Sequence, residues 1–148
     1  MNPINLPRRL REGVLEADEL LADHKPQQAL KLLRELDKKF PHQPDILGLM
    51  ANACFDIGDQ HGYLLAIHQV HELTPNKAEV KLGLAGAYIA NGFMALALQT
   101  FRQFLKRWPD GERTREIQKT IEKLENGLAG FLSEIDFSLE TGLDFASK

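Results

Sequence analysis

The chain has 148 residues, of which 43% are hydrophobic, and its formal net charge is −3. This apolar content is enough for a packed core and is not typical of a disordered chain. The mild negative charge argues against nucleic acid as a partner, because binding to phosphates requires a basic surface. At the N-terminus no apolar signal segment is present, and no run approaches the roughly 20 apolar residues that span a bilayer. We therefore expect a cytoplasmic protein that does not enter the membrane.

Three prolines, Pro41, Pro75 and Pro109, follow one another at intervals of 34 residues. Self-similarity at a fixed period of this size indicates a repeat architecture. Alignment on the prolines divides the chain into units 10–43, 44–77 and 78–111.

Each unit carries the pattern of two helices joined by a turn. An alanine stands at the same place in each first helix, at Ala17, Ala51 and Ala85, where a small side chain lets antiparallel helices approach closely. Gly58 and Gly92 mark the turn in units two and three, and we expect them to adopt the left-handed conformation. His24 takes that place in unit one. The prolines end the second helices, since proline cannot continue a helix interior.

This pattern resembles the tetratricopeptide repeat family, which combines a 34-residue period with a small residue at repeat position 8 and a proline at position 32. Unit three also has the family's aromatic residue, Tyr88, and its second-helix alanine, Ala97. Unit two departs at Tyr63, where alanine is usual, and at Cys54. The resemblance covers residues 8–111. It implies an all-α fold, a right-handed helical-repeat solenoid of antiparallel helix pairs with about seven or eight helices.

After the third unit, residues 112–131 are predicted to form a capping helix. Apolar residues recur there at helical spacing, at Ile117, Ile121, Leu124 and Leu128. Arrays of this family usually end in such a helix, which covers the last apolar face. We accordingly expect one domain at 1–132 and a separate tail at 133–148.

The tail, 133–148, is acidic and apolar, with a net charge of −3. The glycines at 127 and 130 predict a flexible break before it. Ser133 and Asp136 are spaced as in a helix-capping box. The tail is therefore either an extra helix packed on the cap or a docking segment. Its target would be the chain's own groove, a second copy, or further repeats of a longer protein.

The resemblance also implies a concave groove lined by the first helix of each unit, at repeat positions that face it. Carried over residue by residue, these positions give a candidate partner-binding set that mixes apolar and acidic groups. The candidates are Arg11, Val14, Asp18, Asp45, Leu49, Asn52, Phe55, Asp56, Glu79, Leu82, Gly86 and Ile89. Glycines at 48, 83 and 86 weaken these helices, and they predict close approach by a neighbouring helix or a ligand. The apolar members mark either a binding surface or a place where the N-terminal segment or the tail packs.

Some members of the family clamp the C-terminal carboxylates of heat-shock chaperones with lysine, asparagine and arginine. Here the corresponding positions hold Val14, Asp18, Leu49, Glu79 and Gly83. Every clamp residue is missing, and Asp18 and Glu79 are acidic. We therefore expect a protein or peptide partner with apolar anchors and some basic character rather than an acidic C-terminus.

No pattern of catalytic residues or of cofactor binding is present, so we expect no enzyme activity and no cofactor. His68 and His71 have a spacing that would allow a shared metal, but a solvated helix face explains them better. Cys54 is read as a core residue. The leading interpretation is a protein-interaction module, a scaffold or adaptor. The alternatives are a homo-oligomer that assembles through its tail or end helices, and a small chaperone for a secreted client.

Overall fold

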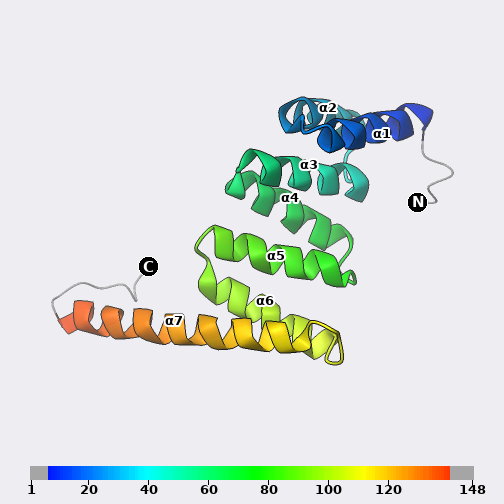
Figure 1. The fold of residues 1–148 in the computed structure, drawn as a ribbon. Helices are drawn as coiled ribbons and strands as arrows, with labels where there is room; N and C mark the ends of the chain where they lie inside the picture. The colour runs from blue at the N-terminus through cyan, green and yellow to red at the C-terminus, as the bar shows by residue number, and fades with distance from the viewer. Residues whose placement is uncertain (1–6, 141–148) are drawn as a thin grey trace.

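The computed structural model describes residues 7–140, which form a stack of seven helices (Figure 1). This part of the chain contains no strand, and the helical-repeat fold expected from the sequence is confirmed. The helices are α1 (Arg8–Ala22), α2 (Pro26–Lys39), α3 (Pro44–Ile57), α4 (Gln60–Leu73), α5 (Ala78–Ala90), α6 (Met94–Arg107) and α7 (Thr114–Glu140). The first pair begins at Arg8, two residues before the first sequence unit, and none of the described helices is long and apolar enough to cross a membrane.

The second helices, α2, α4 and α6, all end in the same backbone conformation. Phe40, Thr74 and Trp108 follow their last residues, with φ of −130°, −134° and −129° and ψ of 71°, 63° and 71°. Each of these residues precedes a proline, which disfavours the helical conformation in the residue before it. The 34-residue period of the sequence is therefore also a period of the backbone.

The turns inside the units require a left-handed residue. Gly58 and Gly92 have φ of +87° and +79°, as predicted, and both are free of steric cost in this conformation. His24 holds the equivalent place in unit one with φ of +59°. Histidine is one of the residues that adopt this region more readily than most, although less readily than glycine.

The core lies between consecutive helices rather than at one centre. Ala17, Ala51 and Ala85 are at most 1% exposed, so that each first helix packs closely on its neighbours. The backbone of each helix lies close to that of the next helix in the chain, and α1 also lies close to α3. Side chains of α5 pack with those of α7 in the last core cluster. One unit cannot bury its own apolar faces, and the stack is held together by these successive interfaces.

Two polar links reinforce the interfaces of unit three. The Asn91 side-chain amide donates to the carbonyl oxygens of Gln60, at 2.9 Å, and Ala87, at 2.8 Å. It thereby ties the end of α5 to the beginning of α4. On the other side, Arg102 of α6 pairs with Glu125 of α7 at 2.5 Å. Both groups of that pair are half exposed, so the amide link is the better protected from solvent.

The last helix, α7, runs without interruption from Thr114 to Glu140. The break that we predicted at the glycines 127 and 130 is therefore wrong. Glycine weakens a helix by about 1 kcal/mol but does not force it to end. Ile117, Ile121 and Leu124 pack α7 against the last core cluster, which stabilises the helix. Residues 133–140 of the expected tail continue this helix, and residues 141–148 lie outside the described part of the chain.

Two glycine-to-alanine substitutions in unit three are expected to change stability in opposite directions. Gly86 is inside α5, and an added Cβ would meet no atom within 4 Å, so Gly86→Ala should stabilise the fold by about 1 kcal/mol. Gly92 is equally uncrowded but left-handed, so Gly92→Ala should destabilise it by about 1 kcal/mol. Urea unfolding followed by circular dichroism measures both. Shifts of the same sign in the two midpoints would contradict this account of the backbone.

Candidate functional site

A hollow with a volume of about 540 Å³ opens on the side of the stack formed by the first helices. We call it the groove. Side chains of α1, α3 and α5 form its walls, and α4 supplies its floor. The principal lining residues are Val14, Leu15, Asp18, Asp45, Gly48, Leu49, Asn52, Tyr63, Ile67, Val70, Glu79, Val80 and Gly83.

The twelve candidate residues divide into three sets by position. Six of them line the groove itself: Val14, Asp18, Asp45, Leu49, Asn52 and Glu79. Arg11 lines an adjoining hollow of about 260 Å³ between α1 and α3, and Leu82 lines another of about 330 Å³ that α7 closes. The remaining four are Phe55, Asp56, Gly86 and Ile89, and none of them borders these three hollows.

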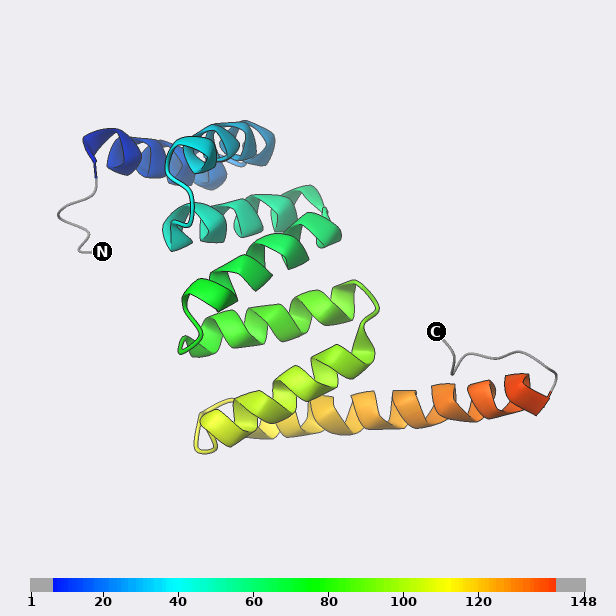
Figure 2. The ribbon, with the colours of Figure 1, turned by 180° about the vertical axis from the view of Figure 1, so that it is seen from behind.

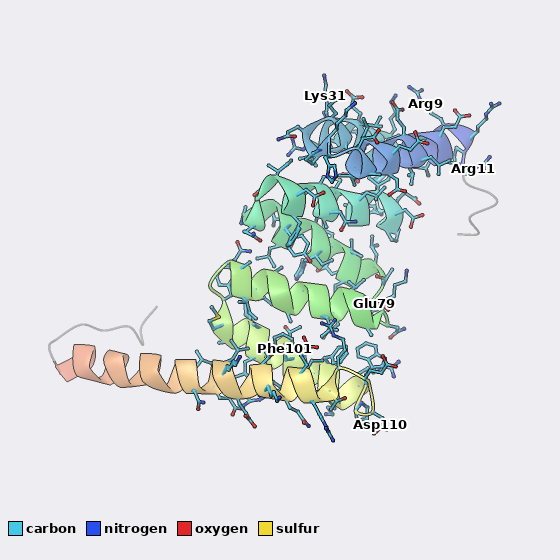
Figure 3. The ribbon with its side chains drawn as sticks, viewed as in Figure 1. Arg9, Arg11, Lys31, Glu79, Phe101 and Asp110 are labelled. Atoms are coloured by element: carbon cyan, nitrogen blue, oxygen red, sulfur yellow. The ribbon has the colours of Figure 1, made fainter. Side chains whose placement is uncertain are left out.

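The groove runs along the N-terminal parts of the first helices. Candidates further along these helices therefore lie outside it. Arg11 and Glu79 lie on the same side of the stack, near where α1 and α5 begin (Figure 3). Phe55 lies near the other end of α3, where its ring meets the edge of Tyr63 at 5.6 Å between centroids. Repeat position gives the direction in which a side chain points around the helix, but it does not give the distance along the groove.

Two of the apolar candidates contribute to the core. Leu82 and Ile89 are partly buried and pack against the cluster that contains Phe101 and Ile117. Their neighbours in the described part of the chain are on α6 and the first half of α7, so these two residues belong to the core between helices. Leu49 is also partly buried, against the first-unit cluster, and still lines the groove.

Sequence reasoning missed the floor of the groove, which belongs to the second helix α4. Tyr63, Ile67 and Val70 reach it between α3 and α5. The available signal was Tyr63 itself, a large residue where the repeat pattern has alanine. Its burial raises the pKa of the phenol, which remains a neutral hydroxyl at physiological pH.

Gly83 makes room for this tyrosine. A Cβ at Gly83 would lie 3.3 Å from the Tyr63 hydroxyl oxygen and 3.4 Å from Ile67, so α4 approaches α5 closely at this point. The predicted close approach is thus confirmed for Gly83. No neighbouring helix approaches Gly48 or Gly86 closely, because an added Cβ at either would have no atom within 4 Å, and approach by a ligand there stays a prediction.

The charged groups of the groove are mostly acidic. Asp18, Asp45 and Glu79 line it, against one cation, Lys77. All four side chains belong to exposed residues, so they can meet a ligand without a large desolvation cost. The groove therefore combines an apolar floor with an acidic margin.

Neither the Cys54 thiol nor the histidines of α4 have surroundings that favour catalysis or metal binding. Cys54 is buried, and burial, with a further effect of the Asp59 carboxylate, raises the pKa of its thiol. The thiolate that a nucleophile requires is therefore disfavoured. His68 pairs with Glu72 at 3.5 Å, and among the described residues no cluster of three or more histidine, cysteine or acidic side chains is placed to hold a metal ion.

Comparison with known proteins identifies the fold. No protein-family model matches the sequence, and the search of curated proteins found no match. Among solved structures, the first TPR of Spaghetti (RPAP3), bound to the HSP90 peptide SRMEEVD, superposes with a TM-score of 0.67. The two sequences are 14% identical, and the match covers 81% of this chain and 93% of that one.

Two further solved structures superpose over most of the chain. The TPR2B-domain:pHsp70 complex of yeast Sti1 has a TM-score of 0.66 and 22% identity, with 82% of this chain and 99% of that chain covered. The Sgt2 TPR domain from Aspergillus fumigatus also has a TM-score of 0.66, at 12% identity, and covers 87% and 85%. Together with the 34-residue period and the paired helices, these superpositions show that the chain has the tetratricopeptide repeat fold.

Proposed function

We propose that this chain is a protein-interaction module that binds a peptide or a helix of a partner protein in the groove. The observation that carries the proposal is the open hollow of about 540 Å³, in which apolar residues of three units lie beside carboxylates. At its margin Leu15 is 62% exposed. An exposed apolar side chain beside an apolar hollow favours a ligand with apolar anchors.

The charge of the groove favours a basic ligand. The Spaghetti domain is bound to the HSP90 peptide SRMEEVD, which has three acidic residues among its last four. In this chain Asp18, Asp45 and Glu79 line the groove, and they would repel such a ligand. We therefore propose a partner segment with apolar anchors and lysine or arginine between them, which these three carboxylates would pair with.

Two synthetic peptides of equal length and identical leucine spacing test the charge preference. One carries lysine and the other glutamate between the leucines, and both have blocked ends. We expect the lysine peptide to bind more tightly, with an affinity that falls as salt is raised, because the attraction is between exposed charges. Fluorescence anisotropy of labelled peptides measures both affinities. Equal affinities of the two peptides would exclude the proposed ligand chemistry. Tighter binding of a third peptide, SRMEEVD, than of the lysine peptide would also exclude it.

A matched pair of aspartate variants locates that preference on the groove. Asp18 lines the groove, whereas the exposed Asp23 is the residue at the end of α1 and borders none of the hollows described. Asp18→Asn should weaken binding of the lysine peptide about threefold, and Asp23→Asn should leave it unchanged. Equal effects of the two variants would show that only the net charge of the protein matters.

The apolar contribution can be tested at Leu15. We expect Leu15→Gln to weaken binding of the lysine peptide about fivefold, because the leucine loses part of the apolar area that a ligand would cover. Leu65, which is 52% exposed on α4 and outside the groove, supplies the control variant Leu65→Gln. Circular dichroism checks that both variants keep their helices. If Leu15→Gln binds as the unchanged protein does, the ligand lies elsewhere.

A further inference from the structure

The last helix, α7, is about twice as long as the others. It has 27 residues, whereas α1 to α6 have 13 to 15. The beginning of α6, at Met94, lies beside Leu124, Gly127 and Leu128, so α6 accompanies α7 only up to this point. The last 12 residues of α7, 129–140, extend past the stack (Figure 2).

The sequence of α7 carries one apolar stripe across both halves. Its members are Ile117, Ile121, Leu124, Leu128, Phe131 and Ile135, at alternating intervals of four and three residues. This is the spacing of helices that pair with another helix. In the first half the stripe packs on the core cluster shared with α6, through Ile117, Ile121 and Leu124. The same stripe continues into the half that extends past α6.

The extending half is not a strong helix former by itself. It contains Gly130 and two serines, which are weaker helix formers than alanine or leucine. The segment continues a helix that is already formed, and packing against another surface would stabilise it further.

An apolar hollow of about 600 Å³ lies next to this segment, between α7 and the beginning of α6. Phe93 and Leu96 line it and remain 49% and 44% exposed. Lys123 is the one charged residue of its lining. No lining residue is shared with the groove, so this surface is independent of the proposed peptide site.

We propose that two copies of this chain associate through α7, with residues 129–140 of each copy lying antiparallel in the hollow of the other. On α7 the hollow is lined by residues within 123–128, directly before the half that extends past α6, so a second copy can place its own extending half there. A two-fold axis near Leu128 places the residues after Leu128 of each copy beside the residues before Leu128 of the other, which makes the interface self-complementary.

Charge supports a second copy as the occupant. Residues 129–140 carry three acidic side chains, Glu134, Asp136 and Glu140, and no lysine, arginine or histidine. The antiparallel arrangement centred on Leu128 brings Glu134 close to Lys123 of the hollow. In this interface the apolar stripe of one copy packs in the apolar hollow of the other. The acidic side chains of the segment lie near Lys123, the one cation of that hollow.

Sedimentation velocity of the full chain over a range of concentrations tests the association. We expect a dimer that Leu96→Gln dissociates at least tenfold more readily and that Leu65→Gln leaves unchanged. Leu96 and Leu65 are similarly exposed, at 44% and 52%, so neither substitution should prevent folding. A monomer at all concentrations would overturn the proposal and assign the hollow to the chain's own C-terminal residues or to another protein. A dimer insensitive to Leu96→Gln would overturn it as well.

Cysteine cross-linking tests the antiparallel geometry. Gly127 lies near the proposed axis, and a side chain there would meet no atom within 4 Å. Under mild oxidation Gly127→Cys should form a disulfide-linked dimer, while Glu140→Cys, far from the axis, should not. The unchanged chain is the control, since its Cys54 is buried. Equal cross-linking at both positions indicates parallel helices and would refute the arrangement.

Discussion

The structure depends on the packing of each helix against its successor in the chain. A helix of a single unit has apolar faces that its own partner does not fully cover, and the next unit completes the burial. Ala17, Ala51 and Ala85 permit this packing in each unit because their small side chains bring the helices close together. Because each unit packs on the next in the same way, the first helices align along one side of the stack. The groove is a consequence of that alignment, and its lining is drawn from all three units.

The sequence predicted the fold because the repeat pattern rests on residues with strong backbone preferences. The prolines at 41, 75 and 109 and the glycines at 58 and 92 act locally, and each has the predicted effect in the structure. The contribution of α4 to the groove was not predictable in this way. It depends on a compensating pair of residues 20 positions apart, Tyr63 and Gly83, which repeat position alone does not connect. Likewise, the prediction of a break in α7 rested on local propensity, whereas the helix begins where it packs against α6 and continues past Gly127 to Glu140.

The groove and the hollow beside α7 lie on different helices and differ in charge. The groove has three carboxylates in its lining, whereas the hollow is apolar with a single lysine. In the proposed arrangement, a basic ligand and an acidic helix would be directed to different places by the charges of these two surfaces. If the two surfaces act together, two copies joined through α7 would present two grooves. A partner with two binding segments would then gain avidity without any new contact.

The nearly linear pattern of contacts has a mechanical consequence. In the described part, backbone contacts join helices that are neighbours in sequence, apart from the pair α1 and α3, and side-chain packing also joins α5 to α7. No such contact connects the two ends of the stack. A small rotation at each interface adds to the next, as in the turns of a spring. The curvature of the groove is accordingly a property of the whole array. The hydrogen bond from Asn91 to Gln60 crosses the interface between α4 and α5, and the pair of Arg102 and Glu125 crosses the interface between α6 and α7, so both links oppose such rotation.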